Sequence, residues 1–407
     1  MRKLKKKGDV MKDRRLYWKI GLIFIPIIFI VGMLLGRVYF SKDKGLINKG
    51  DYKAIAYVTI PASKNWRWIG EVDEKSGVVT SEVDVDYITH IHFAFGMLEA
   101  YQFENEQTGE PLKEEGIVSK EAYKNPVDNK YHYRATLNGW IEEMDTTVEG
   151  GKYLEALVKL KEKKPDLKVL LSIGGWDSDG FCYMAQTGEG RKEFIESCIE
   201  LIKNYKLDGI DIDWEYPTNG GWHAIAVCKT CVGDGRVLLQ EMRQAFDEAF
   251  PGEHKLLAIA SGASQPWLDA KTFEVLDYIN VMCYDYKPGS GTSQASLSYA
   301  REGMGAHLSL VGDTPKNRAK LHLGIPFYNE GGPYLVPYYK KWNGYVDASP
   351  QITKKKMKWV KDKGYGGAFY WAYSMDVFEE DVENPKDERI KSLQRTLYET
   401  LNGKVNK

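Results

Sequence analysis

Acidic residues occupy alternate positions in the segment 208–217, DGIDIDWEYP, whose other residues are mostly apolar and typical of a buried strand. Successive side chains of a strand point to opposite faces, so Asp211, Asp213 and Glu215 share one face, with steps of roughly 6.6 Å along the strand. Burying like charges this close raises the pKa of at least one carboxyl group. A carboxyl group that keeps its proton near neutrality can act as a general acid. The segment therefore predicts an acid-base active site.

Two structural roles would explain the same acidic residues without catalysis. One is a solvated edge strand, and the other is a calcium-binding loop, which combines oxygen ligands with a glycine at a sharp turn. The intervening residues Ile210, Ile212 and Trp214 are bulky and apolar, which favours a strand packed against a layer of helices. Asp208 has the opposite parity to the other acidic residues, so we interpret it as a structural hydrogen-bonding group.

Eight strand patterns alternate with helical patterns along the chain, as parallel βα units require. The expected strands cover residues 54–60, 87–95, 169–175, 209–215, 256–262, 278–285, 322–328 and 367–373. The expected helices include residues 151–163, 191–205, 236–250, 350–363 and 387–401. This order predicts an α/β fold, a (β/α)8 TIM barrel over residues 52–402, with its reactive face at the C-terminal ends of the strands.

Charge is distributed unevenly along the 407 residues. The whole chain has a formal net charge of −1, but residues 1–45 contain 12 Lys and Arg against 3 Asp and Glu, which leaves a net charge of −10 for the remainder. A barrel with this negative balance lacks the basic surface of a nucleic-acid-binding protein. We therefore expect no nucleic-acid partner.

The basic N-terminal tail, residues 1–19, precedes an apolar segment at 20–40, of which residues 20–36 contain no charged side chain. This length is at the lower limit for a membrane span. We favour an uncleaved signal anchor over a cleaved secretory signal or a buried soluble helix, because no small-x-small cleavage site follows. The preceding cations keep the N-terminus inside. After a linker at 41–51, the catalytic domain is expected outside the cell membrane, or secreted if the segment is cleaved.

Five cysteines are too few and too unevenly spaced for a disulfide scaffold. Cys228 and Cys231 form the motif CKTC, for which we favour a local disulfide in an exported domain. A zinc site and free thiols are the alternatives, although two further ligands at zinc-site spacing are missing. Cys198 and Cys283 lie in helical and strand patterns and are expected in the core.

A loop insertion of about fifty residues, 97–148, separates the second and third expected strands. Loops this long are usually functional or partly disordered. Its aromatic residues either pack the loop on itself or line a sugar-binding groove; they are Tyr101, Phe103, Tyr123, Tyr131, Tyr133 and Trp140. Only residues 329–349, about twenty residues, lie between the seventh strand and the next helix, so we expect no inserted α+β domain there. We also expect no sugar-binding module after the last helix.

The acidic segment resembles the signature DGxDxDxE of glycoside hydrolase family 18, the chitinase family, which Asp208, Gly209, Asp211, Asp213 and Glu215 match in full. The resemblance covers roughly residues 52–400. SIGGW at 172–176 is similar to the family's SxGGW, MCYD at 282–285 to its MxYD, and Trp371 to the tryptophan under the reactive sugar. One departure is His92, where the family more often has Asn.

The resemblance implies a retaining, substrate-assisted mechanism. Glu215 would be the general acid and base, and the 2-acetamido carbonyl of the substrate would be the nucleophile. Asp213 would orient the acetamido group and share a proton with Asp211, and Tyr284 would hydrogen-bond the acetamido oxygen. Asp285 would contact the sugar or the acetamido environment. The substrate-binding residues implied are Gly174, Gly175, Trp176, Tyr216, Met282, Asp285 and Trp371.

This chemistry requires a polysaccharide or oligosaccharide that contains N-acetylglucosamine, and the ending WEYP favours chitin or chito-oligosaccharides. We expect no cofactor, no metal and a monomeric enzyme. Two alternatives stay open: a cell-wall or spore-cortex N-acetylglucosaminidase acting on peptidoglycan, and a non-hydrolytic chitin-binding lectin. A lectin of this family would have lost the acid, whereas Glu215 is present here.

Overall fold

The computed structural model divides the chain into two units, Met1–Leu46 and Ile47–Lys407. It describes residues 51–59, 72–73, 78–104, 111–117, 132–137, 150–176, 178, 180–218, 229–285, 293–329, 336–337, 347–377 and 392–405, all within the second unit. Across these residues no helix is both long and apolar enough for a membrane span. The expected anchor at 20–40 and the linker at 41–50 lie outside the described residues.

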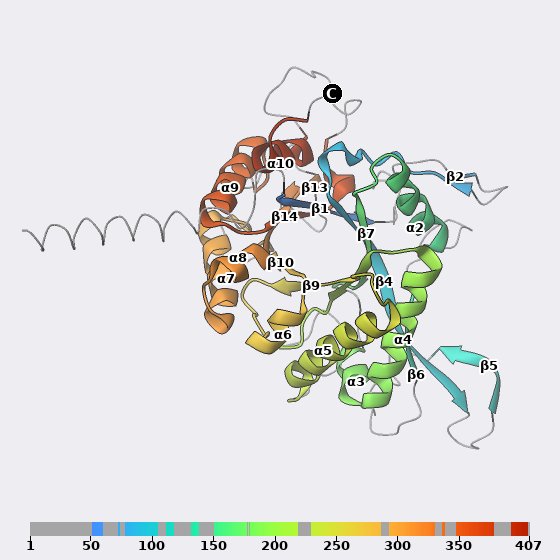
Figure 1. Cartoon of the computed structure of the whole chain (residues 1–407). Helices are drawn as coiled ribbons and strands as arrows, with labels where there is room; N and C mark the ends of the chain where they lie inside the picture. The colour runs from blue at the N-terminus through green and yellow to red at the C-terminus, as the bar shows by residue number, and fades with distance from the viewer. Residues whose placement is uncertain are drawn as a thin grey trace, which may run out of the picture. The chain divides into compact units, whose positions relative to one another are not determined.

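Eight parallel strands form a closed barrel, and helices surround it (Figure 1). The barrel strands are β1 (Lys53–Thr59), β4 (His90–Glu104), β7 (Lys168–Gly174), β8 (Gly209–Asp213), β9 (Leu256–Gly262), β10 (Tyr278–Met282), β11 (Leu321–Pro326) and β14 (Gly367–Trp371). Pairing of β1 with both β14 and β4 closes the sheet. The predicted TIM barrel is therefore confirmed, with strand ends within a few residues of the expected ones except for the end of β4, which lies at Glu104 and not at residue 95.

The described α-helices are α2 (Gly150–Lys159), α3 (Phe181–Gln186), α4 (Gly188–Tyr205), α5 (Cys231–Ala249), α6 (Ala270–Val275), α7 (Leu297–Val311), α8 (Pro315–Lys320), α9 (Pro350–Lys363) and α10 (Leu393–Asn402). Short 3₁₀ turns occur at η1 (Val85–Tyr87), η4 (Leu160–Glu162) and η5 (Tyr373–Met375). The turn η1 explains why β4 begins at His90 and not at the expected residue 87. Asp84 caps this turn by accepting a hydrogen bond from the backbone N–H of Asp86.

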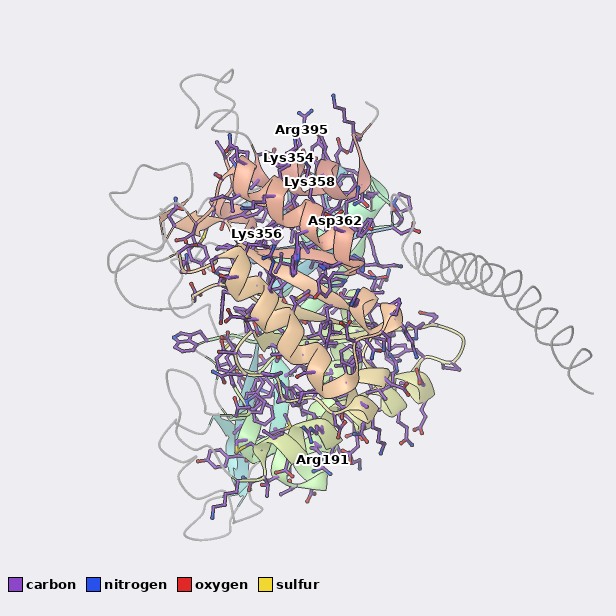
Figure 2. The ribbon with its side chains drawn as sticks, turned by 90° about the vertical axis from the view of Figure 1, so that its left-hand side faces the viewer. Arg191, Lys354, Lys356, Lys358, Asp362 and Arg395 are labelled. Atoms are coloured by element: carbon purple, nitrogen blue, oxygen red, sulfur yellow. A yellow bond between two sulfur atoms is a disulfide. The ribbon has the colours of Figure 1, made fainter. Side chains whose placement is uncertain are left out.

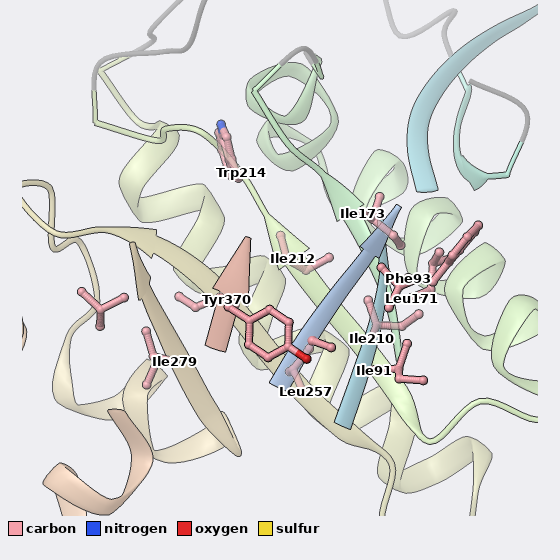
Figure 3. Packing of buried hydrophobic residues seen from close by; sticks show 14 of the residues in the cluster. Ile91, Phe93, Leu171, Ile173, Ile210, Ile212, Trp214, Leu257, Ile279 and Tyr370 are labelled. Atoms are coloured by element: carbon pink, nitrogen blue, oxygen red, sulfur yellow. The ribbon is translucent and has the colours of Figure 1, made fainter. Parts of the chain in front are cut away.

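Alternation along each strand separates two apolar clusters. The larger cluster lies between the barrel and its helices, and the smaller one fills the barrel interior around Tyr57, Tyr278 and Phe369. Figure 3 shows a part of the larger cluster. Its labelled members include Ile91 and Phe93 of β4, Leu171 and Ile173 of β7, and Ile210 and Ile212 of β8. Because these isoleucines occupy the outer face of β8, Asp211 and Asp213 face the barrel interior.

Helix α9 has the bounds that its sequence predicts, because both ends have strong caps. The Ser349 side chain caps the N-terminus, and Gly364, with φ of 71°, ends the helix in the left-handed conformation. Lys354 and Lys358 lie on the exposed face of the helix, whereas Lys356 is buried (Figure 2). The pattern of buried and exposed residues therefore orients α9 against the barrel.

The expected loop insertion at 97–148 contains strands. Beyond the barrel, β4 continues to Glu104 and pairs antiparallel with β5 (Pro111–Ile117) and β6 (His132–Thr136). Strand β6 docks on α4, where backbone N–H groups of Tyr133 and Ala135 donate to the side chains of Glu193 and Ser197. The insertion therefore contains strands that the sequence analysis did not predict. Tyr133 is buried, and the side chains of the other five aromatic residues lie outside the described residues.

Two short hairpins complete the described strands, β2 (Val72–Asp73) with β3 (Val78–Val79) and β12 (Tyr328–Asn329) with β13 (Val336–Pro337). The second hairpin follows β11. Helix α9 begins at Pro350, about twenty residues after β12 ends at Asn329. That interval is too short for an added α+β domain.

The disulfide of this structure differs from the expected one. Cys231, at the start of α5, bonds Cys182 in α3, so the predicted pairing of Cys231 with Cys228 is wrong. The two bonded cysteines are 49 residues apart in sequence, and no local pattern identifies such a partner. Cys228 lies outside the described residues. Cys198 and Cys283 are buried, as predicted, and both are free thiols.

Candidate active site

Strand β8 brings the predicted carboxyl groups to the C-terminal end of the barrel. Asp211 is fully buried, Asp213 is 4% exposed, and Glu215 is half-buried two residues beyond the strand. Asp208, at the opposite end of the strand, accepts a 2.8 Å hydrogen bond from the backbone N–H of Val169 and forms an ion pair with Lys161. The predicted structural role of Asp208 is therefore confirmed.

Asp211 is held by side chains from three other strands. Its Oδ2 atom accepts 2.8 Å hydrogen bonds from the Tyr57 hydroxyl on β1 and the Ser172 hydroxyl on β7. Nδ1 of His92 on β4 lies 3.1 Å from the same oxygen. Two hydrogen bonds and one close polar contact therefore hold the Asp211 carboxyl group in place.

The environment of Asp213 favours its protonated form. Its pKa is raised well above the ordinary value, first by burial and then by the negative charges of Glu215 and Asp211. Its Oδ1 atom has no hydrogen-bond partner among the described residues. The pair thus combines Asp211, whose Oδ2 atom accepts two hydrogen bonds, with Asp213, whose raised pKa favours its protonated form, as acid-base chemistry requires of one carboxyl group.

Tyrosine hydroxyl groups border the carboxyl groups. Burial, followed by the charges of Asp285, Asp213 and Glu215, raises the pKa of Tyr284 well above its ordinary value, so this hydroxyl remains a hydrogen-bond donor. Tyr216 has a raised pKa for the same reasons, burial first and then the charge of Glu215, with a contribution from a hydrogen bond to Glu215.

The segment after β10 places the remaining residues of the MCYD motif. Asp285 has a positive φ of 58°, and its backbone N–H donates to Gln294 Oε1 at 2.9 Å. The Tyr328 hydroxyl donates a 2.6 Å hydrogen bond to Asp285 Oδ1. Met282 is 7% exposed and belongs to the apolar cluster of the barrel interior. The motif therefore brings Tyr284 and Asp285 to the carboxyl groups, while Met282 packs below them.

The glycines of SIGGW meet the enzyme's own backbone. Gly174 and Gly175 have φ values of 125° and 90°, which favour glycine. A Cβ atom at Gly174 would lie 2.1 Å from the Asp213 carbonyl oxygen, and one at Gly175 would lie 2.6 Å from the Phe95 ring. The backbone N–H of Gly175 also donates a 2.8 Å hydrogen bond to the Asp213 carbonyl. The absence of a side chain at Gly174 thus allows β7 to approach β8, and its absence at Gly175 leaves room for Phe95.

Two tryptophans that we expect to bind sugar lie at this end of the barrel. Trp176 is 47% exposed, and its ring packs edge-on against Tyr216 at a centroid distance of 6.5 Å. Trp371, at the end of β14, stacks on Phe95 at 5.3 Å with an interplanar angle of 17°. Trp371 is therefore fixed in orientation by an aromatic partner.

Sequence reasoning missed the roles of Tyr57, Ser172, Phe95 and Tyr328 in this site. Ser172 is part of SIGGW, so the motif contained a signal. Tyr57 and Phe95 have apolar neighbours in β1 and β4, and Tyr328 begins the short strand β12. An aromatic residue at such a position is equally typical of the core. Among the described residues no group of three or more His, Cys, Asp or Glu has the arrangement of a metal site.

Comparison with known proteins adds independent information. The family model described as "Glycosyl hydrolases family 18" matches residues 65–332. Chitinase A1 of Niallia circulans is 33% identical over 303 residues, which cover 55% of this chain and only 42% of that protein. Chitinase 1 of Aphanocladium album is 26% identical over 400 residues, with 82% and 84% of the two chains covered.

Two solved structures share the fold. Chitinase ChiW from Paenibacillus sp. str. FPU-7 has a TM-score of 0.60 at 24% identity, covering 86% of this chain and 43% of that one. A family 18 N-acetylglucosaminidase from Paenibacillus barengoltzii has a TM-score of 0.57 at 23% identity, covering 86% and 100%. From the extent of the family match, together with the carboxyl groups at the end of β8, we conclude that this chain belongs to glycosyl hydrolases family 18.

Proposed function

We propose that this protein hydrolyses β-1,4 glycosidic bonds in chitin or chito-oligosaccharides. The observation that carries this proposal is the arrangement of Asp211, Asp213 and Glu215, in which Asp213 has a raised pKa between a held carboxylate and the half-buried Glu215. The relatives named chitinase A1, chitinase 1 and, in Mus musculus, chitotriosidase-1 support a substrate of this class. Because the chain spans less than half of the first of these proteins, its substrate is a proposal.

In the proposed mechanism Glu215 protonates the glycosidic oxygen. The 2-acetamido carbonyl oxygen of the sugar at the cleaved position attacks the anomeric carbon, so the bond to the leaving sugar breaks and an oxazolinium ion forms. Asp213 orients the acetamido N–H, and Tyr284 donates a hydrogen bond to the acetamido oxygen. Water then attacks the anomeric carbon, with Glu215 as base, and configuration is retained. Trp371 and Trp176 contact sugar faces.

Product analysis tests both substrate and reaction. The purified protein is incubated separately with chitopentaose, with purified peptidoglycan and with a glycoprotein that carries N-glycans. We expect shorter chito-oligosaccharides from the first substrate, with the β configuration retained. Glu215→Gln keeps the size of the side chain but removes the acid, so turnover should fall by ~10²–10⁴-fold while sugar binding remains. Cleavage of peptidoglycan alone would show that peptidoglycan, and not chitin, is the substrate. Binding of chitopentaose without cleavage would indicate a lectin.

We also propose that residues 20–40 anchor the protein in the cell membrane as an uncleaved single-pass segment, with the catalytic domain outside and acting as a monomer. The support is the apolar composition of residues 20–36, which lack charge and follow a basic tail. Fractionation of cells that express the full chain should place the intact protein in the membrane fraction. A soluble extracellular protein that begins near residue 40 would show instead that the segment is a cleaved signal.

A further inference from the structure

His92 is the interior residue of β4 that faces Asp211. Both side chains are fully buried. Nδ1 of His92 lies 3.1 Å from Asp211 Oδ2, and the imidazole ring packs against Tyr57 at a centroid distance of 4.9 Å. The imidazole therefore touches both the aspartate and the tyrosine that holds it.

The other ring nitrogen of His92 contacts a tyrosine hydroxyl. Nε2 of His92 lies 2.9 Å from the Tyr278 hydroxyl. Burial, followed by the charge of Asp211, raises the pKa of Tyr278 well above its ordinary value, so the hydroxyl keeps its proton and can donate it to Nε2. A neutral imidazole that accepts at Nε2 carries its own proton on Nδ1. In that tautomer the proton lies on the side of Asp211.

The contact between His92 and Asp211 is electrostatic in this structure. Nδ1 of His92 and Oδ1 of Asp211 both lack an aligned hydrogen-bond partner among the described residues. Buried polar atoms without partners are costly, and these two belong to side chains that already touch. Rotation of the Asp211 carboxylate would allow Nδ1 of His92 to donate a hydrogen bond to it, without the need for a third residue.

Neighbouring histidines do not provide a positive charge for Asp211. His90 on β4 and His322 on β11 have pKa values held well below the ordinary value, in both cases by burial first and by Lys53 next. Lys53 itself lies 5.6 Å from the ring centroid of Tyr278, with its pKa lowered by burial. The tyrosines in contact with His92, Tyr57 and Tyr278, are neutral, since burial raises both of their pKa values.

We infer that His92 is a positioning residue, which holds the Asp211 carboxylate ionised and thereby places the proton of the carboxyl pair on Asp213. Tyr57 on β1 and Ser172 on β7 donate hydrogen bonds to Asp211, and His92 on β4 adds the close contact of its Nδ1 atom. Donors to a charged carboxylate favour that form. This inference rests on the function proposed above, because the location of the proton on Asp213 matters only in the proposed hydrolysis.

Three substitutions separate the possible contributions of His92. His92→Asn keeps an N–H donor close to the position of Nδ1, His92→Gln keeps one close to Nε2, and His92→Phe keeps only the volume of the ring. We expect His92→Phe to lower kcat by about 10- to 100-fold and to move the acidic limb of the pH profile of kcat/KM to higher pH, since Asp211 then accepts a second proton more readily. His92→Asn should retain more activity than His92→Gln.

The inference would be overturned if His92→Phe has the same kcat as the wild type and the same acidic limb in the pH profile of kcat/KM. So would better rescue by His92→Gln, which would indicate that the contact with Tyr278 is the important one. His307→Gln is the matched control, because His307 is also buried and hydrogen-bonded, to Ser261 and the Gly303 carbonyl, but belongs to the outer helix α7. This control should leave kcat and the pH profile unchanged.

A second measurement does not depend on activity. In protein labelled with ¹⁵N-histidine, the resonances of His92 are assigned by their loss in His92→Phe. We expect the proton on Nδ1, and a change in the Nδ1 resonance in Asp211→Asn, while His307 is unaffected. The inference would be refuted if the proton is on Nε2, Nδ1 is unprotonated, and the Nδ1 resonance does not change in Asp211→Asn. Because this readout requires no substrate, a failure of the proposed substrate remains distinguishable from a failure of His92.

Discussion

The hydroxyl of Tyr57 on β1 donates a 2.8 Å hydrogen bond to Oδ2 of Asp211 on β8, across the barrel interior. The same hydroxyl accepts a 3.0 Å hydrogen bond from the side-chain amide of Asn280 on β10, which fixes its orientation. A side chain from the first strand therefore determines the environment of the carboxyl pair. Because it reaches the site from 154 residues away in sequence, only the closure of the barrel reveals it.

Tyr57→Phe should therefore impair catalysis without unfolding the protein. The variant removes one hydrogen bond to a carboxylate, an interaction worth roughly 1.5–3 kcal/mol. We expect kcat on chitopentaose to fall by about 10- to 100-fold. Tyr370→Phe is a matched control, because the Tyr370 hydroxyl is buried without a hydrogen-bond partner in the described part of the chain. Comparable kcat losses in both variants would indicate a packing effect.

Much of this architecture is predictable from the sequence. All eight barrel strands are identified by their apolar patterns, and α9 by its helical pattern, because these signals are local. The caps at Ser349 and Gly364 coincide with the ends of that pattern. The parity of Asp211 and Asp213 likewise follows from the strand period alone. Their burial inside the barrel is then a consequence of Ile210 and Ile212 facing the helices.

What the sequence does not predict are pairings between distant residues. The disulfide partner of Cys231 is in another helix, and the stacking partner of Trp371 is Phe95 from the second barrel strand. The extension of β4 to Glu104 is missed for a related reason, since its antiparallel partners β5 and β6 are needed to stabilise it. Each of these depends on tertiary contact and not on a local pattern.

The disulfide between Cys182 and Cys231 should contribute strongly to stability. A crosslink that spans 49 residues is worth about 4 kcal/mol by the chain-entropy model. We expect the double variant Cys182→Ala, Cys231→Ala to have a lower Tm than the oxidised wild type in thermal unfolding. A reducing agent should lower the Tm of the wild type and leave that of the variant unchanged; a wild type indifferent to reductant would contradict the pairing.

His307 should make the folded state sensitive to acid. Burial lowers its pKa to about 4, below its ordinary value of 6.5, although the hydrogen bond to the Gly303 carbonyl opposes this. A group with a depressed folded-state pKa stabilises the protein above its unfolded pKa, and this contribution is lost as the pH falls from 6.5 through about 4. The loss is up to about 3 kcal/mol.

His307→Gln should therefore flatten the pH dependence. Free energies of unfolding measured in urea at pH 7 and pH 4.5 should differ less in the variant than in the wild type. Asp376 has the opposite sign, because burial raises its pKa to about 6, so its contribution is full below pH 3.8 and is lost as the pH rises through 6. Only the difference between variant and wild type isolates His307, and parallel pH curves would rule out its role.

Trp371 and Phe95 should act together in binding sugar. The Phe95 ring stacks on Trp371 at 5.3 Å, and aromatic pairs of this kind are worth ~1 kcal/mol beyond their buried area. In a Glu215→Gln background, which binds without turnover, Trp371→Ala should weaken chitopentaose binding by about tenfold or more in calorimetry. Phe95→Leu, which keeps an apolar side chain but loses the stack, should weaken binding by less.

The two substitutions should not be additive, because Phe95 acts on sugar only by holding Trp371. Once Trp371 is alanine, Phe95→Leu should therefore have almost no further effect on affinity. Trp359→Phe serves as the control, since this tryptophan packs against Tyr365 on the outer helix layer. Full additivity of Trp371→Ala and Phe95→Leu would mean that the Phe95 ring contacts the sugar itself, and that the stack does not orient the tryptophan.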